Sequence, residues 1–130
     1  MSENERSEYL ESLCLALETD KKKKIVITGI CDGEDKLATY GVDPDTDSKI
    51  YHTVPRIDKN YPGTGDIFAS VLLGEFLRNQ NFVDSTAFAS NFTSEVMRYT
   101  AKFDTPSRDG VALEAFLGEL TDRQKSKGDI

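Results

Sequence analysis

The sequence predicts a single α/β domain. A β-branched apolar run at residues 25–30, closed by a glycine, is typical of a parallel strand buried on both faces. Two extended segments follow at 37–42 and 49–54, and segments 7–19, 84–102 and 110–120 place apolar residues at the three- and four-residue spacing of helices. The 130 residues suffice for one hydrophobic core but not for two, so residues 1–130 are expected to form one unit.

Charge and composition limit the classes of partner. The chain has 16 basic and 23 acidic side chains, a net charge of −7, which argues against nucleic acid because phosphate binding needs a surplus of Lys and Arg on one face. No apolar stretch reaches the length of a signal-peptide core or a membrane span, so we expect a cytoplasmic protein without a membrane partner. Cys14 and Cys31 lack metal-ligand spacing, and neither a metal site nor a disulfide is expected.

The first predicted helix covers residues 7–19. Its apolar face consists of Leu10, Leu13, Cys14 and Leu17. Residues 1–6 before it and 121–130 at the other end of the chain are polar and expected to be flexible. Four consecutive lysines at 21–24 are interpreted as a solvated loop before the strand, in preference to a phosphate or lipid site.

A turn and a hairpin follow the strand at 25–30. Asp32-Gly33 is a strong turn dipeptide, and the polar segment 43–48 joins the two extended segments as a hairpin loop. This acidic loop lacks the glycine and the terminal glutamate of a calcium-binding EF-hand, which favours a plain turn. His52, the single histidine, is interpreted as a surface strand residue, because no second histidine lies near it to share a metal ion.

The second half of the chain is predicted to be helical. The helix that starts at Asp66 is apolar nearly all round, so we expect other elements to cover it on most sides. Asp84 or Ser85 is expected to cap the next helix. The apolar faces of the last two helices consist of Phe88, Phe92, Val96, Tyr99 and Phe103, and of Leu113, Phe116, Leu117 and Leu120.

The motif Gly63-Thr64-Gly65-Asp66 carries the strongest chemical signal. Its glycines allow a tight turn, and a helix start offers unpaired N–H groups and a positive dipole end, which together form an anion site. The hydroxyl of Thr64 adds a donor. The alternative is that Asp66 is only the N-cap of the helix and the glycines shape an ordinary turn. Pro62 makes the turn rigid and favours the ligand site.

Residues 62–70 resemble the signature of the ribokinase-like (PfkB) small-molecule kinases. The resemblance extends to residues 24–30, the hairpin, residues 54–58 and the later helices, and covers residues 7–120. Within this superfamily the chain is most similar to the pyridoxal and pyridoxamine kinases of vitamin B6 salvage. The resemblance implies a three-layer α/β fold, present here as a partial version that corresponds to the carboxyl-terminal half of such a kinase.

The resemblance also implies roles for the motif. Asp66 would be the catalytic base that takes the proton from the substrate hydroxymethyl group. The backbone N–H groups of Gly63, Thr64 and Gly65 would form the anion hole for the transferring phosphoryl group. ATP would be the donor and Mg²⁺ would shield its phosphates, although no protein ligand for the metal can be identified.

Four further residues match nucleotide-binding positions of the family. Thr28 and Gly29, at the end of the strand, match the phosphate side of the nucleotide cleft. Ile57 and Tyr61 match apolar positions on the loop that flanks the nucleotide. Strand-end and core positions remain the alternative interpretation for all four.

The implied activity is ATP-dependent phosphorylation of the 5'-hydroxymethyl group of pyridoxal, pyridoxamine or pyridoxine. Two alternatives stay open: a non-catalytic nucleotide- or anion-binding fragment, and a hydroxymethylpyrimidine kinase of thiamine synthesis. In this family the substrate pocket precedes the segment present here, so the isolated chain is expected to be inactive or weakly active. An uncovered strand edge and apolar surface would favour a homo-oligomer.

Overall fold

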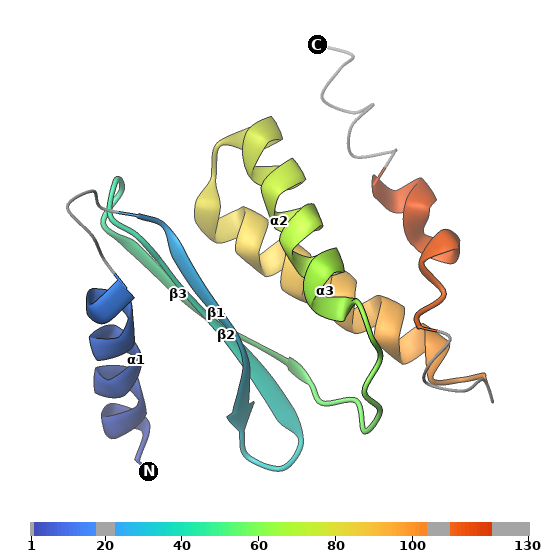
Figure 1. The fold of residues 1–130 in the computed structure, drawn as a ribbon, viewed down its shortest axis with the longest axis horizontal. Helices are drawn as coiled ribbons and strands as arrows, with labels where there is room; N and C mark the ends of the chain where they lie inside the picture. The colour runs from blue at the N-terminus through green and yellow to red at the C-terminus, as the bar shows by residue number, and fades with distance from the viewer. Residues whose placement is uncertain (1, 18–22, 104–109, 121–130) are drawn as a thin grey trace.

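A computed structural model describes residues 2–17, 23–103 and 110–120. The elements are α1 (Glu3–Leu17), β1 (Ile25–Asp32), β2 (Lys36–Asp43), β3 (Ser48–Pro55), α2 (Thr64–Asn79), α3 (Phe82–Thr100) and the 3-10 turn η2 (Leu113–Phe116). Helix α1 lies on one side of the sheet, and α3 lies on the other side with α2 packed against it (Figure 1). The predicted α/β fold is confirmed.

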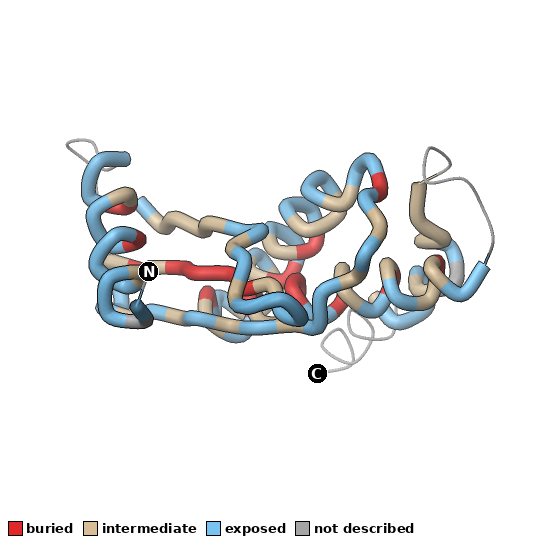
Figure 2. The backbone as a smooth tube through the Cα atoms, turned by 90° about the horizontal axis from the view of Figure 1, so that it is seen from below, coloured by how far each residue is buried: buried red, intermediate tan, exposed pale blue. Residues whose placement is uncertain are grey.

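The sheet is antiparallel with the order β1-β2-β3. The expectation of a parallel strand at residues 25–30 is therefore wrong: Ile25 pairs with Val42 in antiparallel register. The cause is the turn at residues 33–35, because so short a connection can join only antiparallel neighbours. β1 is an edge strand with no fully buried residue, whereas buried residues run along β2 in the middle of the sheet (Figure 2).

The predicted hairpin is confirmed. β2 and β3 pair from Lys36 and Pro55 to Asp43 and Ser48, and the polar loop lies between them. Asp43 organises this loop: its carboxylate accepts hydrogen bonds from the N–H of Asp45 and the hydroxyl of Thr46, both at 3.0 Å. The loop is thus a turn held by its own side chains.

Helix α1 begins earlier than the sequence predicts. The hydroxyl of Ser2 accepts from the N–H of Glu5, and the Glu5 carboxylate accepts from the N–H of Ser2, which is a capping box. Residues 3–6, expected to be flexible, are therefore helical. Leu10 and Cys14 are buried as predicted, but Leu17 is 58% exposed. The expected end of this helix at 18–19, Lys21, Lys22 and the tail at 121–130 lie outside the described residues.

Helix α2 is less covered than expected. It packs against α3, but Leu73 is 59% exposed and Leu77 is 65% exposed, so the expectation of cover on most sides is wrong within this chain. Residues of the segment 111–120 pack against the core that α2 shares with α3, but they leave these two leucines exposed. The helices nevertheless share a core whose buried residues are Val71, Ala89, Phe92 and Val96.

The ends of the later helices also differ from expectation. α3 is capped by Asn81, whose side-chain oxygen accepts from the N–H of Asp84 at 3.0 Å, so neither Asp84 nor Ser85 is the cap. Residues 110–112 are not helical, and the chain turns helical only from Leu113. Phe103 is 45% and Leu117 is 47% exposed, although both were expected on apolar faces.

Within the described ranges, no helix combines the length and the apolar character that crossing a membrane requires.

His52 lies on β3, where its Nε2 is 2.8 Å from the side-chain oxygen of Asn91 on α3. Its ring therefore joins the sheet to the helix layer.

Candidate active site

The glycine motif forms the first turn of α2. The helix starts at Thr64, and Gly63 precedes it as the N-cap residue with φ +85°, a left-handed conformation that suits glycine. The N–H of Ile67 donates to the carbonyl of Gly63 at 3.0 Å. The N–H groups of Thr64, Gly65 and Asp66 consequently have no acceptor within the helix, which is the arrangement that binds anions.

Asp66 is not the helix cap. It is the third residue of α2, it is exposed, and no side-chain bond caps the helix. The interpretation that Asp66 serves only as the N-cap is therefore wrong. Its carboxylate makes no hydrogen bond or ion pair with another described residue, and it lies in the turn where the helix dipole stabilises negative charge. Asp66 is thus available to accept a proton from a bound molecule.

The hydroxyl of Thr64 has a partner inside the loop. It donates to the carbonyl of Tyr61 at 3.3 Å, so in this conformation its proton is directed away from a ligand. Gly110, with φ +74°, lies close to the loop on another side, because a Cβ built there would be 3.8 Å from the carbonyl oxygen of Pro62. The loop is thus closed by a bond from the Thr64 side chain to its own backbone, and Gly110 lies next to it.

A cavity of about 240 Å³ adjoins the start of α2. Thr28, Gly29, Ile57, Thr64 and Gly65 all line it, although they come from three separate segments of the sequence. Thr28 and Gly29 reach it because β1 has a bulge there: the pairing with β2 shifts between Ile27 and Ile30, and Gly29 has φ +70°. Bulges of this kind commonly redirect side chains at functional sites.

Three predicted site residues do not line the cavity. Gly63 and Asp66 flank Thr64 and Gly65 in the chain, so they lie beside it. Tyr61 is 5% exposed, and its buried hydroxyl has no hydrogen-bond partner. The structure thus places Tyr61 in the interior and not on the cavity wall.

Helix α3 also contributes to the cavity, which the sequence pattern did not indicate. Ser90, Thr93, Ser94 and Met97 line the cavity, and their spacing of three and four residues is that of one helix face. This polar stripe lies beside the aromatic face, which dominates the pattern in the sequence. Asn60 on the loop before α2 lines the cavity as well. No side chain of the lining is charged, so the cavity suits an uncharged group.

No group of three or more His, Cys, Asp or Glu side chains that could hold a metal ion occurs in the described part of the chain. The donor in the first turn of α2 is the single carboxylate of Asp66. Mg²⁺ usually binds through one or two carboxylates together with substrate phosphates and water, so this set fits Mg²⁺ only when a nucleotide brings the remaining ligands.

No protein-family model matches the chain. Among solved structures, pyridoxal kinase from Lactobacillus plantarum has a TM-score of 0.77 and 26% sequence identity over 90% of this chain. The chain has the pyridoxal kinase-like fold. A protein named phosphomethylpyrimidine kinase from Bacteroides thetaiotaomicron has a TM-score of 0.79 and 26% sequence identity over 93% of this chain. A second crystal form of that protein, with pyridoxal, has a TM-score of 0.77 and 26% identity, again over 93% of this chain.

The chain spans 40% of the length of the Bacteroides protein in one crystal form and 42% of the Lactobacillus kinase. The resemblance to ribokinase-like kinases is thereby confirmed, together with the expectation that the chain matches only part of such an enzyme. These neighbours are named as kinases.

Proposed function

We propose that this chain supplies the nucleotide- and phosphate-binding part of an ATP-dependent kinase that phosphorylates the 5'-hydroxymethyl group of a B6 vitamer: pyridoxal, pyridoxamine or pyridoxine. One observation carries the proposal. The cavity brings Thr28, Gly29 and Ile57 together with Thr64 and Gly65, next to the start of α2. Residues assigned to nucleotide binding and to the anion hole by resemblance thus lie around one space.

The two parts of this site suit different parts of ATP. The uncharged cavity lining suits the base and ribose, and the hydroxyl of Thr28 and the amide of Asn60 have no hydrogen bond with other described residues. The N–H groups at the start of α2 suit the phosphates, because they add to the positive end of the helix dipole. ATP would therefore bind with its phosphates toward Gly63, Thr64 and Gly65.

Asp66 is assigned the role of general base. The substrate hydroxyl loses its proton to the Asp66 carboxylate as its oxygen bonds to the γ-phosphorus, and the bond from that phosphorus to the β-γ bridging oxygen breaks to release ADP. The N–H groups of the anion hole stabilise the charge on the transferring phosphoryl group. Bound Mg²⁺ supplies neutralisation of the nucleotide phosphates.

This chain spans about two-fifths of the length of the neighbouring kinases. We therefore propose that the isolated chain still binds nucleotide but phosphorylates substrate weakly or not at all. Titration of the ¹⁵N-labelled chain with Mg-ATP should shift the amide signals of residues 63–67. Asp58 is an exposed acid outside the cavity lining, so Asp58→Asn is the matched control for the variant Asp66→Asn. Absence of shifts at these residues would exclude the binding site. Strong phosphorylation of pyridoxal by the isolated chain, abolished by Asp66→Asn, would show instead that the chain is a sufficient catalyst.

A hydroxymethylpyrimidine kinase is the second candidate. The neighbour from Bacteroides that is named a phosphomethylpyrimidine kinase supports it. Initial rates with pyridoxal and with hydroxymethylpyrimidine, measured on a protein that contains this chain and a complete kinase fold, would discriminate the two. A non-catalytic nucleotide-binding role would show as Mg-ATP binding without phosphorylation of either compound.

We also propose self-association, a dimer or higher oligomer. Leu73 and Leu77 expose apolar surface on α2, and the outer edge of β1 has no strand partner among the described residues. Light scattering at micromolar concentration should give a mass above 14.5 kDa, and Leu73→Glu with Leu77→Glu should lower it. A compact monomer would contradict the proposal.

The cytoplasmic location and the exclusion of nucleic acid and membrane partners stay predictions.

A further inference from the structure

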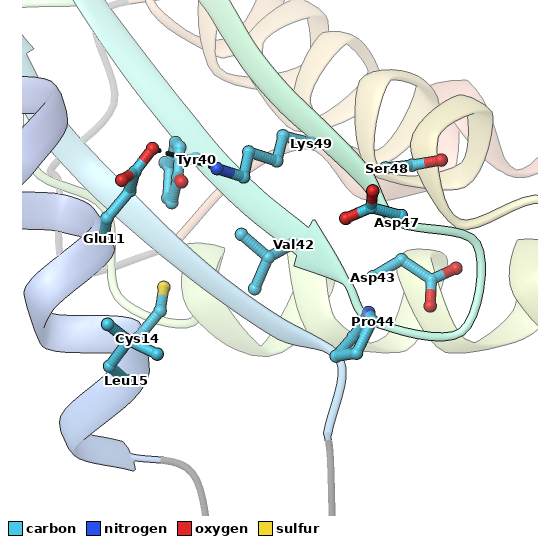
Figure 3. A pocket seen from close by; sticks show the side chains of 10 residues that line it. All are labelled: Glu11, Cys14, Leu15, Tyr40, Val42, Asp43, Pro44, Asp47, Ser48 and Lys49. Atoms are coloured by element: carbon cyan, nitrogen blue, oxygen red, sulfur yellow. Dashed lines mark hydrogen bonds and ion pairs between the residues drawn. The ribbon is translucent and has the colours of Figure 1, made fainter.

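A second cavity lies on the other side of the sheet, between α1 and the β2-β3 hairpin (Figure 3). Its volume is about 340 Å³. Successive residues of a strand point to opposite faces, so Thr39 of β2 faces α3, where its hydroxyl is 3.5 Å from that of Ser90, whereas Tyr40 packs against Leu10 and Cys14 of α1. We call this space the α1-hairpin cleft; it is separate from the kinase-like site.

The cleft has an apolar base and an open mouth. Val42 and the buried Cys14 form the base, and Pro44 closes one end. Leu15 is 67% exposed beside the opening. A ligand can therefore bury apolar surface here without displacing any element of the fold.

Tyr40 provides an unsatisfied polar group. The residue is 5% exposed and lines the cleft, and its hydroxyl is buried without a hydrogen-bond partner. Burial raises the pKa of Tyr40, so the phenol stays protonated at neutral pH and can donate or accept a hydrogen bond. A buried hydroxyl without a partner is unfavourable. Its oxygen has almost no exposed surface, so a polar ligand atom that removes this cost reaches it only when neighbouring side chains of the cleft move aside.

The charges around the cleft favour a cation. Lys49 on β3 forms an ion pair with Glu11 on α1, with 2.9 Å between Nζ and Oε1, as the dashed line in Figure 3 marks. Lys24 lies 3.4 Å from the carboxylate of Asp43 and 2.6 Å from that of Asp45, so its charge is shared between these two acids. Asp47 makes no hydrogen bond or salt bridge with a described residue. Acidic side chains thus outnumber basic ones in the lining of the cleft, and Asp47 lies at its hairpin end.

We propose that the α1-hairpin cleft binds a small organic amine with an apolar body. The ammonium group pairs with Asp47, the body lies on Val42 and Leu15, and a hydroxyl or ether oxygen at the other end bonds to the Tyr40 hydroxyl. Three residues of strand separate Tyr40 from the start of the loop, so the ligand is about 10 Å long. The carboxylates of Glu11 and Asp47 would repel a bound anion.

Tyramine is the probe, because it has a phenol hydroxyl, an aromatic body and an ammonium group. Titration of the ¹⁵N-labelled full chain with tyramine at millimolar concentration should shift the amide signals of Cys14, Val42 and Lys49. Tyr40→Phe, which keeps the ring, should weaken binding about five-fold, the effect of one hydrogen bond. Asp47→Asn should weaken it by at least as much, and Asn tolerates the φ of +51° at this position.

Matched ligands and a control variant decide the result. Phenethylamine, which lacks the hydroxyl, should bind wild type more weakly than tyramine and should not distinguish Tyr40→Phe from wild type. 3-(4-Hydroxyphenyl)propionate, which replaces the ammonium by a carboxylate, should not bind, and Asp58→Asn should leave tyramine binding unchanged. The proposal is overturned if tyramine leaves the three amide signals in place, if the carboxylate binds equally well, or if Tyr40→Phe and Asp47→Asn bind tyramine as wild type does.

Discussion

Gly63 and Gly65 flank Thr64 at the start of α2, yet the structure predicts opposite effects for their replacement by alanine. A Cβ at either position would have no atom within 4 Å, so steric overlap contributes nothing. Gly63 has φ +85°, where an L-residue costs about 1–2 kcal/mol. Gly65 lies inside the first helical turn, where alanine is favoured over glycine by up to about 1 kcal/mol. Gly63→Ala should therefore be about 2 kcal/mol less stable than Gly65→Ala.

Thermal unfolding followed by circular dichroism tests this difference. At this chain length about 1 kcal/mol corresponds to a change of roughly 4 °C in Tm, so the two variants should differ by about 8 °C. Gly74→Ala, in the middle of α2 and also without a neighbour within 4 Å, is the matched control and should raise Tm as Gly65→Ala does. Equal Tm values for Gly63→Ala and Gly65→Ala would refute the left-handed cap.

The same variants separate stability from nucleotide binding. The methyl group of Gly65→Ala would occupy the space in which we propose that phosphate binds, so Mg-ATP affinity should fall although the fold is more stable than wild type. Gly74→Ala should bind Mg-ATP normally. If Gly65→Ala also binds normally, the anion-hole proposal fails while the account of helix stability stands.

Three further predictions concern stability. Asn81→Ala removes the cap of α3 and should cost about 1 kcal/mol in urea denaturation; no change would mean that the Asn81 bond to Asp84 contributes nothing. Phe92→Ala, at a residue 2% exposed, should cost about 3–5 kcal/mol. Phe103→Ala, at a residue 45% exposed that contacts only the edge of the core through Tyr99, should cost clearly less, and equal losses would contradict the assigned core. Burial raises the pKa of Tyr40 above 10.0, so the folded state retains a proton that the unfolded state releases, and stability should fall as pH rises beyond that value. The urea midpoint of Tyr40→Phe should fall less over this range than that of wild type, and an equal fall would contradict this contribution.

The local elements could be predicted because their signals are local. The Asp32-Gly33 dipeptide predicts the turn after β1, and the polar segment 43–48 between two extended segments predicts the hairpin; both are present. The start of α1 was missed because Ser2 and Glu5 act as a reciprocal pair, which an apolar pattern does not reveal. The cap of α3 was missed because Asp84 and Ser85 are as suitable in type as Asn81, and only the backbone geometry selects among them.

The candidate site likewise has features that the sequence alone determines and features that only the tertiary structure determines. The sequence by itself determined the chemistry of the motif, since glycines before an aspartate at a helix start create free N–H groups and an acid whatever surrounds them. The sequence did not determine which residues meet there. The bulge at Thr28 and Gly29, the loop at Ile57 and the stripe on α3 converge only because β1 lies beside β2 and α3 crosses the sheet. Tyr61 is buried by the same packing, and the sequence does not reveal this because burial depends on neighbours that are distant in the chain.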